Sequence, residues 1–175
     1  MKENPFEHLA EIEDRESSHF YGKYRGIVTD VDDPDQMGRI RAKVPFVYGD
    51  EEACDWAFPV VPFAGKDYGL FLLPEVGDSV WMEFENGDIE HPLWTGCWWR
   101  KGDLPDPKEP AQRVLTSMTG MQLIFDDDAK ELSLKHPGGA EITLTDSSIT
   151  IKVGAKKIEI SSTSVSVNDG AFEVT

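Results

Sequence analysis

The sequence predicts an all-β protein, in which a small barrel is followed by a strand array that three chains wind into an intertwined triple-stranded β-helix. Short alternating segments bounded by glycine, proline or aspartate fill the first hundred residues of the 175-residue chain. Beyond them, apolar pairs separated by one residue recur every seven to ten residues, which is typical of a strand repeat. Together these observations predict a barrel and an array on one chain.

The barrel is predicted over residues 21–100 from the turns that divide it. A strand that ends near Val31 should lead through the turn 32–35 into a second strand over 39–44, which makes a hairpin. Further strands are expected over Trp56–Phe63, Gly69–Leu73, Ser79–Glu85 and Leu93–Trp99. Five or six strands of this length suit a small barrel.

Residues 1–20 are expected to form an arm before the barrel. Its segment Phe6–Ser18 is the only helix candidate of the chain, because Phe6, Leu9 and Ile12 give it an apolar stripe among acidic residues. The stripe has no evident role in the barrel core. We therefore expect it to contact a partner protein or a neighbouring chain.

A connector is predicted over residues 101–112, since Pro105, Pro107 and Pro110 favour an extended, semi-rigid chain. The array follows over residues 113–175. Its strands carry one narrow apolar stripe each, and a single chain of such strands cannot enclose a core. Three identical chains around one axis would cover the stripes and satisfy the strand edges. The residues expected in this trimer core are Leu132, Leu134, Ile142, Leu144, Ile149, Ile151, Ile158, Ile160, Val165 and Val167.

An alternative for the array is that its strands form the second sheet of a sandwich with the barrel strands. The seven-to-ten-residue spacing alone does not exclude it.

Composition argues against nucleic acid as a partner. A formal net charge of -16 removes the attraction to phosphates that supplies most non-specific affinity for DNA and RNA. Single-strand binding also needs aromatic residues interleaved with Lys and Arg, whereas the five tryptophans lie among acidic and apolar residues. Core or interface roles are favoured for Trp56, Trp81, Trp94, Trp98 and Trp99.

No signal peptide and no membrane span are expected, because no run approaches about 18 consecutive apolar residues. Synthesis in the cytoplasm fits this pattern. Cys54 and Cys97 are too far apart for a CxxC motif and are expected to be buried free thiols.

Catalytic and metal sites are not predicted. Glu83 and Glu85 alternate with apolar neighbours, which indicates the solvent face of a strand rather than a glycosidase carboxylate pair. The segment 30–35 differs from a calcium loop, which needs glycine at its sixth position and glutamate at its twelfth. The histidines lack a metal-ligand spacing; they are His8, His19, His91 and His136.

An ordered series of motifs extends over about a hundred residues and resembles the central spike family of contractile tails. That family includes phage baseplate assembly protein V and the barrel and needle region of VgrG-type proteins. The motifs are Gly26–Asp30, Asp33–Pro34, Gly38–Pro45, Trp56–Ala57, Pro74–Val80, Phe84, Gly87–Asp88, Pro92–Leu93, Gly96, Gly120 and Ile124–Asp127.

The resemblance implies an N-terminal OB-fold seated on a baseplate hub or tube-capping protein, and a homotrimeric β-helix that points toward a target membrane. The implied role is mechanical, with no catalysis and no cofactor, in a particle assembled from cytoplasmic components. The segment 171–175 follows a turn and lacks the histidines of an iron-holding tip. Its Ala171, Phe172 and Val174 are expected to bind a PAAR-repeat tip protein by strand addition. A trimeric OB-barrel adhesin or scaffold outside any injection machine is the alternative function.

Overall fold

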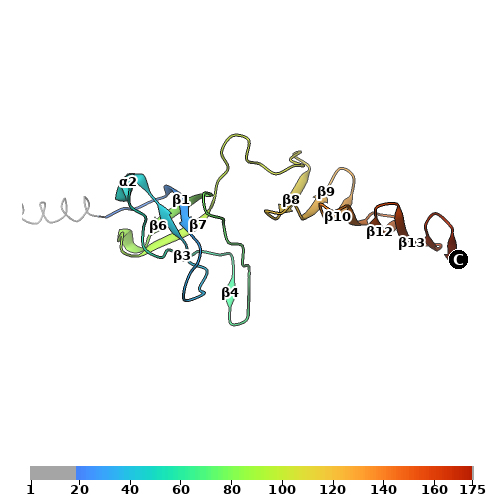
Figure 1. Cartoon of the computed structure of the whole chain (residues 1–175), viewed down its shortest axis with the longest axis horizontal. Coiled ribbons are helices and arrows are strands. Elements are labelled where there is room, and N and C mark those ends of the chain that lie inside the picture. The colour runs from blue at the N-terminus through green and yellow to red at the C-terminus, as the bar shows by residue number, and fades with distance from the viewer. Residues whose placement is uncertain (1–18, 175) are drawn as a thin grey trace, which may run out of the picture. The chain divides into compact units, whose positions relative to one another are not determined.

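A computed structural model describes residues 19–174, and the chain divides between Gly102 and Asp103 into two compact units (Figure 1). Each unit contains its own sheet. The expected arm with Phe6, Leu9 and Ile12 lies outside the described residues.

The first unit is built on a five-stranded sheet with the strand order β2-β1-β6-β7-β3. Two isolated bridges, Ile40 with Ala57 and Lys43 with Ala53, link the region of β2 to the segment before β3. They bring the two edges of the sheet together, as a small barrel requires. The elements of this unit are β1 (Tyr24–Asp30), β2 (Arg41–Lys43), α2 (Pro45–Tyr48), β3 (Phe58–Pro59), β4 (Ala64–Gly65), β5 (Tyr68–Gly69), β6 (Ser79–Phe84), the 3-10 turn Glu85–Gly87 and β7 (Pro92–Cys97).

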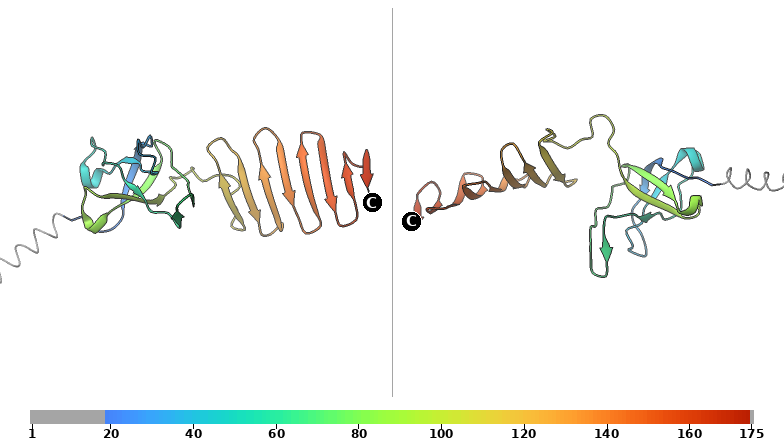
Figure 2. Two further views of the ribbon diagram at one scale, coloured as in Figure 1. Left: turned by 90° about the horizontal axis from the view of Figure 1, so that it is seen from below. Right: turned by 180° about the vertical axis from the view of Figure 1, so that it is seen from behind.

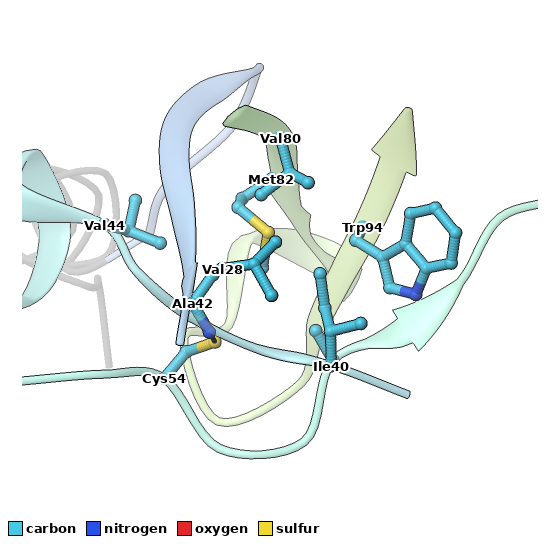
Figure 3. Packing of buried hydrophobic residues seen from close by; sticks show 9 residues of the cluster. Val28, Ile40, Ala42, Val44, Cys54, Val80, Met82 and Trp94 are labelled. Carbon is cyan, nitrogen blue, oxygen red and sulfur yellow. Dashed lines mark hydrogen bonds between the residues drawn. The ribbon is translucent and has the colours of Figure 1, made fainter. Parts of the chain in front are cut away.

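The barrel core consists of side chains that alternate inward from these strands (Figure 3). Val28 on β1 and Met82 on β6 lie almost fully buried, together with residues from β2, β7 and the following loops. Cys54 joins them and accepts a hydrogen bond from the amide of Ala42 at 3.3 Å. The full cluster is Val28, Ile40, Ala42, Val44, Cys54, Ala57, Val80, Met82 and Trp94.

Several barrel predictions are confirmed and others are wrong. The first hairpin and the strands β6 and β7 lie where the alternation places them. The long strands predicted over 56–63 and 69–73 do not form: β3 has two residues, and the chain then enters the small hairpin β4-β5. Pro59 and Pro62 explain this, since proline cannot donate to a ladder. The short helix α2 was not predicted, although Pro45 at its start is a typical first helical residue.

The two cysteines differ in their environment. Both are free thiols, as expected, but only Cys54 is buried, and Cys97 is exposed. Cys97 lies at the last position of β7, where the strand leaves the sheet. Burial raises the pKa of the Cys54 thiol, so that thiol is held in its neutral form.

The second unit is an eight-stranded antiparallel meander in which consecutive strands are neighbours (Figure 2). The predicted apolar pairs all lie on its strands, and turns that include residues 138–139, 146–147 and 168–170 join three of the strand pairs. The strands are β8 (Gln112–Thr116), β9 (Gln122–Asp126), β10 (Glu131–Lys135), β11 (Ala140–Leu144), β12 (Ser148–Val153), β13 (Lys156–Ser161), β14 (Val165–Val167) and β15 (Phe172–Val174).

The expectation that neighbouring chains satisfy the strand edges is wrong for the interior strands of the meander. Neighbouring chains are not needed to satisfy the interior strands, because each strand from β9 to β14 pairs on both sides within the chain. In the described residues the open edges of this sheet are β8 and β15. The winding of three chains around one another stays a prediction.

Candidate trimer interface

Two continuous rows of apolar side chains cross one face of the meander. The register places Leu134 opposite Ile142, Ile142 opposite Ile151, and Ile151 opposite Ile158. A parallel row joins the other member of each pair in the same way. We call the rows the inner ladders: Leu115, Leu123, Leu134, Ile142, Ile151, Ile158, Val167 and Phe172 form the first, and Phe125, Leu132, Leu144, Ile149, Ile160, Val165 and Val174 form the second.

All ten residues predicted for the trimer core lie on the inner ladders, because the two-residue strand period gives every pair the same face. Within one chain these side chains are not covered: Ile151 is 43% exposed and Ile158 is 42% exposed. Cross-strand neighbours shield part of each side chain and leave its outward surface in water. A continuous apolar face of this extent marks an association surface.

The opposite face of the meander is polar over most of its length. Its central row changes from Ile124 through Ser133 and Thr143 to Thr150 and Glu159. Ion pairs flank this row. Ile124 and Ser133, at the start of this row, are already buried within the chain. From Thr143 on the row is polar, whereas the ladder face is apolar throughout and suits the interior of an assembly.

Lys157 shows how charge is arranged on the polar face. Its ammonium lies 2.6 Å from Asp169 and 3.2 Å from Glu159. Hydrogen bonds to Asp169 and then to Glu159 raise the pKa of Lys157. The ion pair with Asp169 ties β13 to the turn before β15 and helps fix the end of the meander.

The predicted tip residues are the end of the same ladders rather than a separate site. Phe172 pairs with Val167, and Val174 pairs with Val165, as the last rungs. Both side chains are exposed, and the outer edge of β15 pairs with no described strand. Ala171 lies in the turn before β15, where its amide donates to Asn168 at 3.4 Å.

The candidate ligand and catalytic residues lie apart from the ladders. In the described part of the chain, no group of three His, Cys, Asp or Glu residues could hold a metal ion. Glu83 contacts the ammonium of Lys23 at 2.6 Å, and His91 contacts Asp88 at 3.1 Å. Glu83 is therefore engaged in an ion pair, and Asp88 contacts an imidazole ring nitrogen.

Two tryptophans on the outer face of the barrel pack against each other and against an arginine. Trp81 and Trp98 lie with ring centroids 6.1 Å apart. The guanidinium of Arg25 lies over both rings, at 4.8 Å from the centroid of Trp98 and 5.7 Å from that of Trp81. Arg25, Trp81 and Trp98 therefore form one cation–π cluster on the barrel.

The apolar hairpin that contains β4 and β5 was missed by the sequence analysis. Its residues were assigned to two barrel strands, yet Phe63 and Phe71 are exposed. The signal that could have identified it is the pair of prolines at 59 and 62, which ends the ladder.

Comparison with known protein families identifies both units. Residues 24–99 match the type VI secretion system/phage-baseplate injector OB domain. Residues 112–173 match the phage baseplate V C-terminal trimerisation domain. This chain belongs to the phage-baseplate and type VI secretion injector family. The trimerisation domain is the meander with the inner ladders, so the family match and the exposed apolar face both indicate a homotrimer.

Curated relatives of this injector family member include spike proteins of type VI secretion systems. The "Actin cross-linking toxin VgrG1" of Vibrio cholerae is 29% identical over 106 residues, which are 54% of this chain and 10% of the relative. The "Type VI secretion system spike protein VgrG4b" of Pseudomonas aeruginosa is 29% identical over 111 residues, 61% of this chain and 14% of the relative. The matched part of the chain thus spans 10% to 14% of the length of these relatives.

Among residues 19–174, no helix has the length and apolar character needed to cross a membrane.

Proposed function

We propose that this chain is the central spike subunit of a contractile injection apparatus, a non-enzymatic part that transmits force from the tube to a piercing tip. The barrel would sit on the hub or tube-capping protein, and the trimerised meander would project toward the target membrane. The observation that carries the proposal is the pair of inner ladders within a sheet matched to a trimerisation domain. Covered by two other copies, this face becomes a closed core that suits axial load.

Self-association is the first requirement of this function. Burial of an apolar face contributes about 25 cal/mol per Å² removed from water, so many half-exposed Ile, Leu and Val side chains favour the trimer strongly. Static light scattering should report about 59 kDa, three times the chain mass of 19.6 kDa. A monomer at micromolar concentration contradicts the spike function.

Two partner contacts belong to the proposal. The segment with Phe6, Leu9 and Ile12 would contact the hub or a neighbouring chain through its apolar stripe. The open edge of β15, with Ala171, Phe172 and Val174, would receive a PAAR-repeat tip protein by strand addition. The trimer would contact the target membrane only transiently.

The deciding experiment is isolation of contractile particles from cells that produce this chain, followed by quantitative mass spectrometry. We expect three copies of this chain per particle. When the gene for this chain is deleted, we expect particles that lack a tip. A trimer that never co-purifies with sheath and tube proteins would favour the adhesin or scaffold alternative.

A further inference from the structure

The segment 58–73, which we call the apolar hairpin, carries several large apolar side chains that the barrel of its own chain leaves exposed. Tyr68 is 68% exposed and Phe71 is 75% exposed, and Phe58, Phe63 and Leu72 are exposed beside them. In the ribbon the hairpin extends away from the barrel strands (Figures 1 and 2). A patch of this composition marks an interaction surface.

The hairpin has little to hold it in place. Its strands β4 and β5 have two residues each, and the amide of Leu70 donates to the carbonyl of Phe63 at 3.2 Å. An isolated two-stranded ribbon is marginally stable in water. The exposed aromatic residues therefore indicate that another surface covers the hairpin in the assembled protein.

A cavity lies between the hairpin and the barrel. It has a volume of about 210 Å³ and is lined by Met37 and Trp94 from the barrel side and by Tyr68, Phe71 and Leu72 from the hairpin. An apolar cavity of about 150 Å³ is large enough to hold benzene. The indole N–H of Trp94 already donates to the carbonyl of Gly38 at 3.1 Å, so the cavity suits an apolar ring.

The charge of the apolar hairpin favours a second copy of this chain as the partner that covers it. The chain has a net charge of -16, so three copies repel one another over most of their surface. The apolar hairpin contains one cation, Lys66, and one anion, Asp67, and is neutral. It is a surface on which two copies can meet without bringing like charges together.

The trimerisation domain places three barrels within reach of one another. Each barrel is tethered by residues 101–111, which span at most about 40 Å when fully extended. Tethering of this length corresponds to a millimolar effective concentration, so even a weak contact between barrels forms.

We propose that the apolar hairpin of each copy packs onto the barrel of the next copy, with Phe63 entering the neighbour's cavity. Phe63 is exposed and does not line the cavity of its own chain. The cavity is lined by the hairpin and by the barrel, whereas Phe63 lies outside that lining. Phe63 of one copy and the cavity of the next are therefore different surfaces, so the contact is head-to-tail and closes into a ring of three. This contact rests on the trimeric state of the proposed function and adds a second, barrel-level interface to it.

The test is photocrosslinking of the full-length chain with p-benzoylphenylalanine in place of Phe63. We expect a covalent dimer of about 39 kDa, twice 19.6 kDa, whose crosslinked peptide contains Met37, Leu72 or Trp94 of the partner. Phe46 on α2, which is 78% exposed, provides the matched control and should give no covalent dimer. Crosslinks confined to single chains, in a sample that light scattering shows to be trimeric, overturn the hairpin contact and leave the trimer intact.

Hydrogen exchange supplies a second readout that needs no bulky probe. In the trimer, the amide of Leu70 should exchange at least tenfold more slowly than in Phe63→Asp, because docking holds the ribbon closed. Light scattering of that variant should still report about 59 kDa, since the inner ladders are unchanged. Equal exchange rates in the two proteins contradict the proposal, and a monomeric wild-type protein removes both interfaces.

Discussion

Asp33 and Arg39 form a nearly enclosed ion pair at the loop between β1 and β2. The Nε of Arg39 donates to Oδ1 of Asp33 at 3.1 Å, and Nη2 of Arg39 donates to the same oxygen at 2.5 Å. The side chain of Arg39 is 12% exposed and that of Asp33 is 4% exposed. Asp33 also accepts the backbone amide of Met37 at 2.8 Å. One carboxylate thus closes the loop that the sequence predicted as a plain turn.

The first prediction concerns this carboxylate. Asp33→Asn keeps the shape of the side chain but removes the enclosed charge beside Arg39, which leaves that shielded cation with Asp35 as its remaining carboxylate partner. The barrel should unfold several degrees lower in differential scanning calorimetry. Asp35→Asn is the control, because Asp35 contacts the same guanidinium from a side chain that is 65% exposed. A smaller effect for Asp33→Asn than for Asp35→Asn contradicts this role.

The pH dependence of stability follows from the same pair. Hydrogen bonds from Arg39 hold the pKa of Asp33 well below its ordinary value of about 4. Because the folded pKa is the lower one, the contribution is complete above the ordinary value and is lost as the pH falls toward the folded pKa. Barrel stability should decline below about pH 4 in urea unfolding. Asp33→Asn should show a shallower decline in that range.

The sequence predicted the meander better than the barrel for a physical reason. Pairs such as Ile142/Leu144 and Ile149/Ile151 have the strand period, and glycine or aspartate turns stand between them, so local signals agree with the fold. The order of the barrel strands depends on contacts between distant segments, such as the bridge between Ile40 and Ala57. Residues 60–73 look like strands because they are apolar, whereas Pro59 and Pro62 interrupt the ladder and leave this segment outside the five-stranded sheet.

The sequence predicted which face of the strands forms the candidate trimer interface, but not which residues on that face are neighbours. The alternation placed Leu134 and Ile142 on one side, whereas the register that makes them neighbours comes from turn lengths in the structure. The cavity beside Trp94 was beyond sequence reasoning, because it joins the hairpin to residues more than twenty positions away.

Two tryptophans of the barrel provide a matched test of hydrogen bonding. The indole N–H of Trp94 donates to Gly38, whereas that of Trp98 is buried without a partner among the described residues. Trp→Phe removes the same atoms at both sites. Trp94→Phe should be less stable than Trp98→Phe by about 1–2 kcal/mol in urea unfolding, because only the first change breaks a bond and the second removes an unpaired donor. Equal losses would show that ring packing decides both cases.

The inner ladders can be tested with one substituent on two adjacent residues. Ile151→Lys places a cation on the ladder face, where three copies would bring like charges together without partners, at a cost of several kcal/mol. Thr150→Lys places the same cation on the polar face, opposite Glu159. Light scattering at micromolar concentration should show dissociation of the first variant and a trimer for the second. Two trimers would show that the ladder face is not the core.

The end of the meander gives the last prediction, which separates two ways of binding a tip protein. β15 offers an open backbone edge together with the last ladder rungs, Phe172 and Val174. Truncation after Asn168 removes both features, whereas Phe172→Ser combined with Val174→Ser removes only the apolar rungs. If the tip protein adds a strand, backbone hydrogen bonds supply most of the affinity. Calorimetry with a purified PAAR-repeat protein should then show a loss of at least tenfold in affinity for the truncated trimer and a smaller loss for the serine variant. Equal affinity of the intact and truncated trimers would place the tip contact elsewhere.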